Sequence, residues 1–345
     1  MIVKRNAPTM HDVARLAGVS ISTVSAVVNE RPIVSPDLHA AVQKAIKALG
    51  YSPNVGARGL RSGRTKILGF VVPDIANPFF VGALRGVEDE GVKHGYEVIV
   101  YNSNDQPELE LRHLKALYAQ RADGILLAPA DSYAAREMWM QHGQSPLVYV
   151  DCVPMKANVN CVVTDNYNAS YEAIRYLIGL GHQKIAIISG RLVHSTSIDR
   201  VDGCRRAMQE ANLPVREEAL REGDSHIESG YQIGLNLLQS TDPPTAIFAL
   251  NNRMGLGVLR AIRELAVPCP EKVSVLTFDD PDWAEVFSPS LTAIEQPTFE
   301  LGKAAVQMLM EAIEADQKGT EFEPHKLVLK STLHVRNSTA PPGVS

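Results

Sequence analysis

The sequence predicts an α + α/β protein, with a small helical N-terminal unit followed by a larger body of doubly wound parallel sheets. Residues 9–50 carry apolar side chains at helical spacing, interrupted by glycines. From residue 67 onward, short apolar runs alternate with helical patterns, which is typical of βαβ units. The chain has 345 residues, 45% of them hydrophobic, so it is long enough for both parts.

The first helix is expected to begin after Thr9 and to end at Gly18. Asp12 stands three residues after Thr9, which is the spacing of a capping box. An apolar stripe follows, made of Val13, Leu16 and Ala17. Glycine adopts the left-handed conformation without steric cost, so the chain can turn at Gly18 into a second helix.

Two more helices have similar boundaries. Ser20 can cap the second helix, and the third is expected between Ser35 and Gly50, with Pro36 in its first turn. The core face of the second helix is expected to carry Val24, Val27 and Val28. Its exposed side is expected to carry Ile21, Ser22, Ser25, Ala26 and Asn29. Together the three helices predict a helix-turn-helix head.

Charge separates this head from the rest of the chain. Residues 1–66 contain ten Lys or Arg and three Asp or Glu, a net charge of +7, which leaves 24 basic and 36 acidic residues elsewhere. A polyanion is therefore attracted to one end of the chain and repelled by the remainder. This asymmetry favours a nucleic-acid-binding module over a generic three-helix domain.

The body is expected to contain more strands than one ordinary sheet. The predicted strands are 67–72, 96–100, 124–128, 147–150, 184–188, 246–250 and 273–278. Residues 151–165 between them are rich in polar and turn residues, which indicates a division into two lobes. Open parallel sheets bind ligands beyond the carboxyl ends of their strands, so the predicted ligand site lies at those ends.

Several motifs, in this order, resemble the lactose-repressor (LacI/GalR) family of transcriptional regulators. The head supplies Met10-His11-Asp12-Val13-Ala14, Ala17-Gly18-Val19-Ser20, Thr23-Val24-Ser25 and Asn29. The next segment supplies Tyr51-Ser52-Pro53-Asn54 and Ala57-Arg58-Gly59-Leu60-Arg61. The body supplies Asn77-Pro78-Phe79-Phe80, Asp123-Gly124-Ile125, Gly181-His182, Arg200 with Gly203, Asn251, Phe278-Asp279-Asp280 and Gln296-Pro297. The resemblance covers nearly the whole chain.

This resemblance implies a helix-turn-helix head at 1–52, a hinge at 53–66 and a type I periplasmic-binding-protein-like body at 67–339, which binds the effector and forms the dimer. Two doubly wound lobes joined by three crossings are expected in the body. Lobe one is expected at about 67–162 and 295–320, and lobe two at about 163–294 and 321–339.

The resemblance also implies a ligand-responsive repressor that binds a near-palindromic double-stranded DNA operator as a homodimer. The implied DNA contacts are Ser20, Ile21, Ser22, Thr23, Ser25, Ala26 and Asn29 in the head, and Asn54, Ala57, Arg58 and Leu60 in the hinge. Hydroxyl and amide groups bind phosphates and base edges. Leu60 is expected to wedge into the minor groove. Ala26 departs from the family, because most relatives carry a base-reading Arg or His there.

In the body, the resemblance implies a small polar effector between the lobes, a sugar or sugar derivative, with a nucleobase left open. The implied contacts are Phe79, Phe80, Asp151, Thr196, Arg200, Asn251, Asp279 and Gln296. One of the two phenylalanines is expected to pack into the core, and a structural salt bridge is the alternative role for Arg200 and Asp279. Ser225 and Cys152 stand where some relatives carry larger side chains, so Trp283 is a candidate for the missing ring.

Other classes of protein are disfavoured. The sequence has no P-loop, GxGxxG, GxSxG or HExxH motif, so neither an enzyme nor a cofactor is expected, and an Asp279-Asp280 metal pair is disfavoured because adjacent side chains at a strand end point apart. A secreted solute-binding protein needs an export signal and has no use for residues 1–66. Without an apolar span or leader, the chain is expected in the cytoplasm, not in a membrane.

The cysteines and the C-terminus complete the expectations. Four cysteines without a CxxC pair indicate reduced packing thiols rather than a zinc site or a disulfide framework. Residues 337–345 are expected to form a frayed tail. They lack the leucine heptads on which the family's tetramer depends, which favours a dimer.

Overall fold

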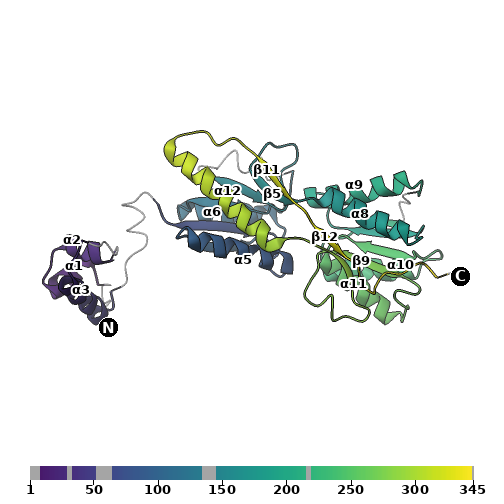
Figure 1. Cartoon of the computed structure of the whole chain (residues 1–345), viewed down its shortest axis with the longest axis horizontal. Helices are drawn as coiled ribbons and strands as arrows, with labels where there is room; N and C mark the ends of the chain where they lie inside the picture. The colour runs from purple at the N-terminus through teal and green to yellow at the C-terminus, as the bar shows by residue number, and fades with distance from the viewer. Residues whose placement is uncertain (1–7, 29–32, 52–63, 134–144, 215–218, 344–345) are drawn as a thin grey trace. The chain divides into compact units, whose positions relative to one another are not determined.

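The computed structural model of the chain describes residues 8–28, 33–51, 64–133, 145–214 and 219–343. The chain divides into two compact units, Met1–Thr65 and Lys66–Ser345, called the head and the body below (Figure 1). Most of the predicted hinge, 53–66, lies outside the described residues. Within the described ranges, every helix is too short or too polar to cross a lipid bilayer.

The head contains helices α1 (Met10–Ala17), α2 (Ile21–Val28) and α3 (Pro36–Leu49). The Thr9–Asp12 capping box opens α1, and Gly18 ends it with a φ of 66°. The Ser20 hydroxyl accepts a hydrogen bond from the Thr23 amide at 3.1 Å, as predicted for a cap. The core consists of Val13, Ala14, Val24, Val27, Val42, Ala45 and Tyr51.

Leu16 contradicts the predicted apolar stripe of α1. It is 55% exposed, whereas Val13 is fully buried. Only a narrow face of this eight-residue helix, centred on Val13 and Ala14, packs against the other two helices, and Leu16 lies outside that face. One predicted core residue therefore lies on the surface of the head.

The first lobe of the body is a six-stranded parallel sheet with the order β2-β1-β3-β4-β5-β11. Its strands are β1 (Ile67–Val72), β2 (Glu97–Asn102), β3 (Gly124–Leu127), β4 (Leu147–Val150), β5 (Cys161–Thr164) and β11 (Lys326–Leu329). Helices α5 (Pro78–Lys93) and α12 (Thr298–Lys318) cover one face, and α6 (Pro107–Ala119) covers the other (Figure 1).

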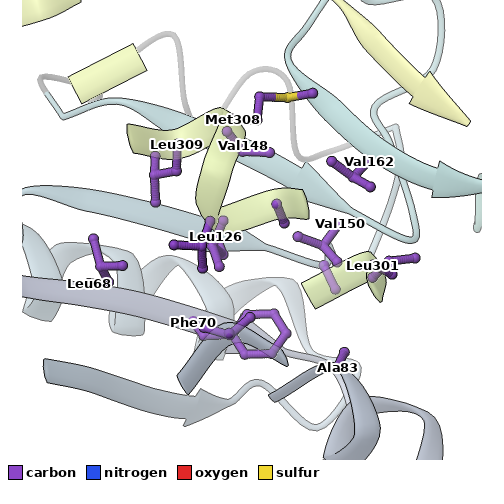
Figure 2. Packing of buried hydrophobic residues seen from close by; sticks show 14 of the residues in the cluster. Leu68, Phe70, Ala83, Leu126, Val148, Val150, Val162, Leu301, Met308 and Leu309 are labelled. Atoms are coloured by element: carbon purple, nitrogen blue, oxygen red, sulfur yellow. The ribbon is translucent and has the colours of Figure 1, made fainter. Parts of the chain in front are cut away.

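The core of this lobe lies between the sheet and the α5–α12 pair (Figure 2). Leu126, Val148 and Val150 point from the strands towards Leu301 and Leu309 of α12. Glycines allow the two helices to approach closely. A Cβ added at Gly86 would lie only 2.0 Å from the Phe299 carbonyl oxygen, and a Cβ added at Gly302 would lie 2.0 Å from the Ala83 carbonyl oxygen. Larger residues at these glycines push the helices apart.

The second lobe is a six-stranded sheet with the order β7-β6-β8-β9-β10-β12, in which only β12 is antiparallel. Its strands are β6 (Ile185–Ser189), β7 (Leu220–Glu222), β8 (Ala246–Ala249), β9 (Ser274–Phe278), β10 (Thr292–Glu295) and β12 (Thr332–His334). Helices α8 (Asn166–Gly179) and α9 (Ser195–Glu210) pack on one face, and α10 (Ile227–Leu238) and α11 (Asn252–Glu264) pack on the other.

The chain crosses between the lobes at residue 165, at 296–297 and at 330–331. The third crossing corrects the prediction that lobe two resumes at residue 321. Strand β11 pairs in parallel with β5, with Lys326 opposite Cys161, so residues up to 329 belong to the first lobe. The strand is a largely exposed edge strand without a hydrophobic alternation, so its sequence does not reveal to which sheet it belongs.

The prediction of a frayed C-terminal tail is wrong for the described residues after 336. Ser338 is fully buried, its amide donates to the Ser290 carbonyl, and its own carbonyl accepts from the Val275 amide at 2.8 Å. Its hydroxyl donates to the Val275 carbonyl and accepts from the Thr292 amide. The Ala340 carbonyl accepts a hydrogen bond from His182 at 2.9 Å. These residues complete the second lobe at the starts of β9 and β10.

Candidate functional site

A cleft of about 80 Å³ lies between the carboxyl ends of the strands of the two lobes. All eight predicted effector contacts line it, namely Phe79, Phe80, Asp151, Thr196, Arg200, Asn251, Asp279 and Gln296. Four of them follow the ends of β4, β8, β9 and β10, and the other four lie in the first turn of α5 and the first two turns of α9. This is where doubly wound sheets bind ligands.

Arg200 of α9 is the central cation of the cleft. Its side chain is buried, with Nε donating to Asn166 Oδ1 and Nη1 donating to the Leu250 carbonyl, both at 2.7 Å. The guanidinium group lies 3.6 Å from the centre of the Phe278 ring. Burial lowers the pKa of Arg200, and nearby Asp279 and Asp151 oppose that effect. The side chain is therefore held in one orientation before a ligand binds.

Asp279 follows β9 in a left-handed conformation, with a φ of 68°. Gln296 Nε2 donates a hydrogen bond to its Oδ1 at 2.5 Å. Burial raises the pKa of the Asp279 carboxyl, whereas the charge of Arg200 and the Gln296 hydrogen bond lower it. Arg200 donates hydrogen bonds to Asn166 and Leu250 rather than to Asp279, so among the described residues no direct salt bridge occupies this carboxylate.

Asp151 faces this pair from the first lobe. It follows β4, has a φ of 66°, and its buried Oδ1 has no hydrogen-bond partner within the part of the chain that the structure describes. Burial raises the pKa of Asp151 to about 7, with Arg200 lowering it and Asp279 raising it. Carboxylates from both lobes thus share the charge of one arginine.

Three predicted contacts have structural roles as well. Asn251 caps α11, because its Oδ1 accepts from the Met254 amide at 2.8 Å, and its Nδ2 donates to the Ser225 carbonyl. The rings of Phe79 and Phe80 meet edge to face at 5.0 Å, and both side chains are 5% exposed. Both phenylalanines belong to the first-lobe core and also line the cleft.

Residues absent from the prediction join the lobes across the cleft. Asn252 Nδ2 donates to Asn77 Oδ1 at 3.1 Å, and Arg253 pairs with Asp74. On the other side, His194 Nε2 is 2.8 Å from the Ala130 carbonyl oxygen. The expectation that ligands bind beyond the carboxyl ends of parallel strands could have found Asp74 after β1 and Asp105 after β2.

Trp283 does not supply a ring to the cleft. It packs against the second-lobe cluster under α11, and its ring centre lies 5.7 Å from that of Phe287.

Cys152, which lines the cleft, is buried between the Ser132 hydroxyl at 3.0 Å and the Ser195 hydroxyl at 3.4 Å. All four cysteines are free thiols. The described residues contain no cluster of His, Cys, Asp or Glu suited to a metal ion.

Glu110 of α6 supports the contact between the lobes at Ala130 and His194, because it binds the Ala130 backbone on the first-lobe side. Its carboxylate is buried and accepts a hydrogen bond from the Ala130 amide at 2.6 Å, while the carbonyl of Ala130 faces His194. Burial raises the pKa of Glu110 from an ordinary 4.5 to about 7. The folded protein therefore holds a proton between these pH values that the unfolded chain has lost.

We expect Glu110→Gln to raise the free energy of unfolding at pH 8 by on the order of 3 kcal/mol, because the amide keeps an acceptor for Ala130 without a buried charge. The difference should disappear near pH 4, where the carboxyl is largely protonated in the folded and the unfolded chain alike. Urea unfolding at both pH values measures it, with Glu108→Gln on the exposed side of the same turn as control. Equal stability of Glu110→Gln and the parent at pH 8 contradicts the prediction.

The predicted DNA-contact surface of the head centres on α2. Ser20, Ile21 and Ser22 are exposed, and Thr23 and Ser25 are half-buried. The Ser20 hydroxyl lies 2.6 Å from that of Ser22 and 2.8 Å from that of Thr23. These side chains form a continuous group of hydroxyls at the start of the helix.

Ala26 corrects the predicted exposed face of α2, because it is only 8% exposed. A single methyl group does not extend past the side chains around it, so the structure does not place Ala26 on the surface. The remaining predicted DNA contacts, Asn29, Asn54, Ala57, Arg58 and Leu60, lie outside the described residues.

Comparisons with known proteins cover both units. Residues 9–54 match the bacterial regulatory proteins of the lacI family, and residues 65–338 match the periplasmic binding proteins and sugar binding domain of the LacI family. The chain is 35% identical over 329 residues to the HTH-type transcriptional repressor PurR of Vibrio vulnificus (strain CMCP6), which covers 94% of this chain and 98% of the relative.

Two solved structures extend the similarity. One is the transcriptional regulator CelR in complex with cellobiose, with a TM-score of 0.73 and 32% identity, covering 96% of this chain and 99% of that one. The other is the Lac repressor dimer bound to operator and the anti-inducer ONPF, with a TM-score of 0.85 and 27% identity, covering 97% and 100%. Because the matches span the helical head and the two-lobed body, the chain belongs to the LacI family of bacterial regulatory proteins and is a DNA-binding transcription regulator rather than an enzyme.

Proposed function

We propose that the protein is a ligand-responsive repressor that binds a near-palindromic operator as a homodimer and responds to a small sugar-like effector in the cleft. The observation that carries this proposal is the convergence of all eight predicted effector contacts on one cleft between two lobes. Bacterial operators are on the chromosome, so the proposed place of action is the cytoplasm.

The head supports the DNA-binding part of the proposal. Residues 1–66 carry a net charge of +7, and the hydroxyls of Ser20, Ser22 and Thr23 gather at the start of α2. A recognition helix enters the major groove with its N-terminal residues towards the bases. We propose contacts from these residues, Ile21 and Ser25, together with Asn29 and the hinge residues Asn54, Ala57, Arg58 and Leu60.

The cleft supports the effector part. Arg200 and Asp279 come from the second lobe, and Asp151 and the two phenylalanines come from the first, so a ligand between them contacts both lobes. A ligand changes DNA affinity when it binds one arrangement of the lobes more tightly than another. The similar CelR structure contains cellobiose, which favours a sugar here.

The homodimer rests on symmetry and on the similar Lac repressor, which was solved as a dimer on its operator. Two copies related by a twofold axis read two half-sites, so a palindromic operator matches a symmetric protein. The C-terminal residues 337–343 pack onto the second lobe of their own chain, which favours a dimer over a tetramer built by that segment.

Selection of operator fragments from random duplex tests the proposal. The full chain should select a near-palindrome and bind it with an affinity that falls by at least tenfold between 50 and 200 mM salt, because Lys and Arg side chains displace several counterions. Leu60→Ala should weaken binding to the selected site much more than to random duplex, since a wedge acts only where the centre can be kinked.

Binding that is independent of salt, or a selected site without symmetry, contradicts the proposed DNA recognition. Equal losses on selected and random duplex show that Leu60 is not the wedge. The matched control is Leu38→Ala, because Leu38 of α3 is exposed. Leu49→Ala is unsuitable, because Leu49 packs against the head core.

A further inference from the structure

Three buried side-chain oxygens in the cleft have no hydrogen-bond partner among the described residues. They are Oδ1 of Asp105, Oδ1 of Asp151 and Oε1 of Gln296. His194 Nε2 lies 3.7 Å from Oδ1 of Asp105 and makes its hydrogen bond with the Ala130 carbonyl instead. Buried acceptors without donors are unfavourable, so a ligand that fills this cleft gains most by donating hydrogen bonds.

The acceptors come from both lobes and from separate loops. Asp105 follows β2 and Asp151 follows β4 in the first lobe, whereas Gln296 follows β10 in the second. A ligand that satisfies all three must carry several donors spread around its ring. Hydroxyl groups do this, because each of them both donates and accepts.

The charges of the cleft disfavour an anionic ligand. Among the described lining residues, four are aspartates and only Arg200 is a Lys or Arg. Asp74 is paired with Arg253, while the charge of Arg200 is shared between Asp151 and Asp279. A phosphate or carboxylate placed here finds no second Lys or Arg among the described lining residues and faces carboxylates of like charge.

Helix N-termini also line the cleft, and they normally attract anions. Here their amides are already engaged. Asn77 accepts from the Phe79 amide at the start of α5, and Asn251 accepts from the Met254 amide at the start of α11. The amide of Ser195, at the start of α9, donates to the Ser132 hydroxyl. The backbone of Asn252 bonds to the Asp279 carboxylate. The protein's own side chains therefore occupy these anion-binding positions.

We propose that the cleft selects an uncharged sugar, which donates hydroxyl hydrogen bonds to Asp105, Asp151 and Gln296, and rejects phosphorylated and carboxylated sugars. This inference rests on the proposed function, in which the cleft is the effector site. It deepens that function by naming the chemical class of the effector.

A matched ligand panel tests the proposal on the full chain. The panel pairs glucose with glucose 6-phosphate and glucuronate, and ribose with ribose 5-phosphate, and it adds other uncharged mono- and disaccharides, cellobiose among them, and free purine bases. At least one uncharged sugar should raise the unfolding temperature, and its anionic counterpart should bind at least tenfold more weakly by calorimetry.

The proposal is overturned if no uncharged sugar binds, if an anionic sugar binds more tightly than its uncharged counterpart, or if purine bases are the only ligands. An anionic sugar that changes operator affinity refutes this inference and leaves the proposed function intact, whereas a purine base that does so also replaces the sugar-like effector of the proposed function and leaves its operator binding intact. Absence of salt-dependent operator binding refutes the proposed function instead.

The pH dependence of binding distinguishes a donating ligand from an accepting one. Burial raises the pKa of Asp151 to about 7, and a hydroxyl that donates to this carboxyl favours its ionised form. Affinity for the sugar found in the panel should therefore rise up to about tenfold from pH 6 to pH 8. The groups facing Asp151 are Arg200 and Asp279 of the second lobe, with Cys152 beside it in the chain.

Asp151→Asn should bind the sugar at least tenfold more weakly at pH 8 and should flatten the pH dependence, whereas Asp282→Asn on the surface should change neither. A loss of affinity with rising pH shows that the ligand accepts from protonated Asp151. A dependence that persists in Asp151→Asn assigns the titration to another group. Either result overturns the assigned role of Asp151.

Discussion

A chain that ends after Arg336 is expected to lose on the order of 5 kcal/mol of unfolding free energy, because several buried groups lose their partners at about 1–3 kcal/mol each. The deletion leaves the buried amides of Val275 and Thr292 without acceptors. It also removes the Ala340 carbonyl from His182 and the Thr339 hydroxyl from Tyr176. A loss of this size approaches the whole stability of many domains.

Urea unfolding of the full and shortened chains measures the effect. A chain that ends after Gly343 keeps every contact described above and should retain the unfolding midpoint. The single substitution Ser338→Ala removes two buried hydroxyl hydrogen bonds and should cost about 1–3 kcal/mol. If the chain that ends after Arg336 unfolds at the same urea concentration as the parent, residues 337–343 do not stabilise the second lobe.

Replacing Arg200 with methionine is expected to reduce effector affinity by at least a hundredfold and to lower the stability of the body by about 3–5 kcal/mol. The substitution removes the bonds to Asn166 and Leu250 and leaves the carboxylates of Asp151 and Asp279 without their shared cation. The head is unchanged in sequence, so operator binding should persist below the unfolding temperature while the response to effector disappears.

Arg206→Met is the matched control, since Arg206 lies on the same helix and its side chain is 57% exposed in an ion pair with Glu210. Surface pairs of this kind contribute little, so this variant should match the parent in both measurements. Calorimetry with the sugar identified in the panel and operator titration on the full chain complete the test. If Arg200→Met binds the effector with an affinity within tenfold of the parent's, the ligand does not contact the Arg200 guanidinium group.

The sequence predicts seven strands and misses five strands of three or four residues each in the described ranges, among them the buried β5 and the nearly buried β10. The seven predicted runs correspond to β1, β2, β3, β4, β6, β8 and β9. Strand β7 has three residues, two of them charged, and β11 is a largely exposed strand whose short apolar run shows no alternation, so neither has the pattern of a central parallel strand. Their places depend on pairing with distant segments.

The same distinction holds for the cleft. Asp151, Asn251 and Asp279 follow buried strands, so the architecture predicted from those strands already brings them to one edge of each sheet. Contacts such as Asp74 with Arg253 depend on how closely two lobes approach, which no local pattern encodes. The buried methyl of Ala26 shows a similar limit, because its exposure depends on neighbours outside its own helix.

The three crossings also fix the order in which the parts of the protein can be completed during translation. The head core ends at Tyr51, whereas the first-lobe sheet lacks β11 until residue 329 and the second lobe lacks its last contacts until residue 340. At about 5–20 residues per second, the 280 residues after the head take about 14–56 s to synthesise. A fragment released before residue 329 therefore contains the whole head core but lacks part of each of the two sheets between which the cleft lies.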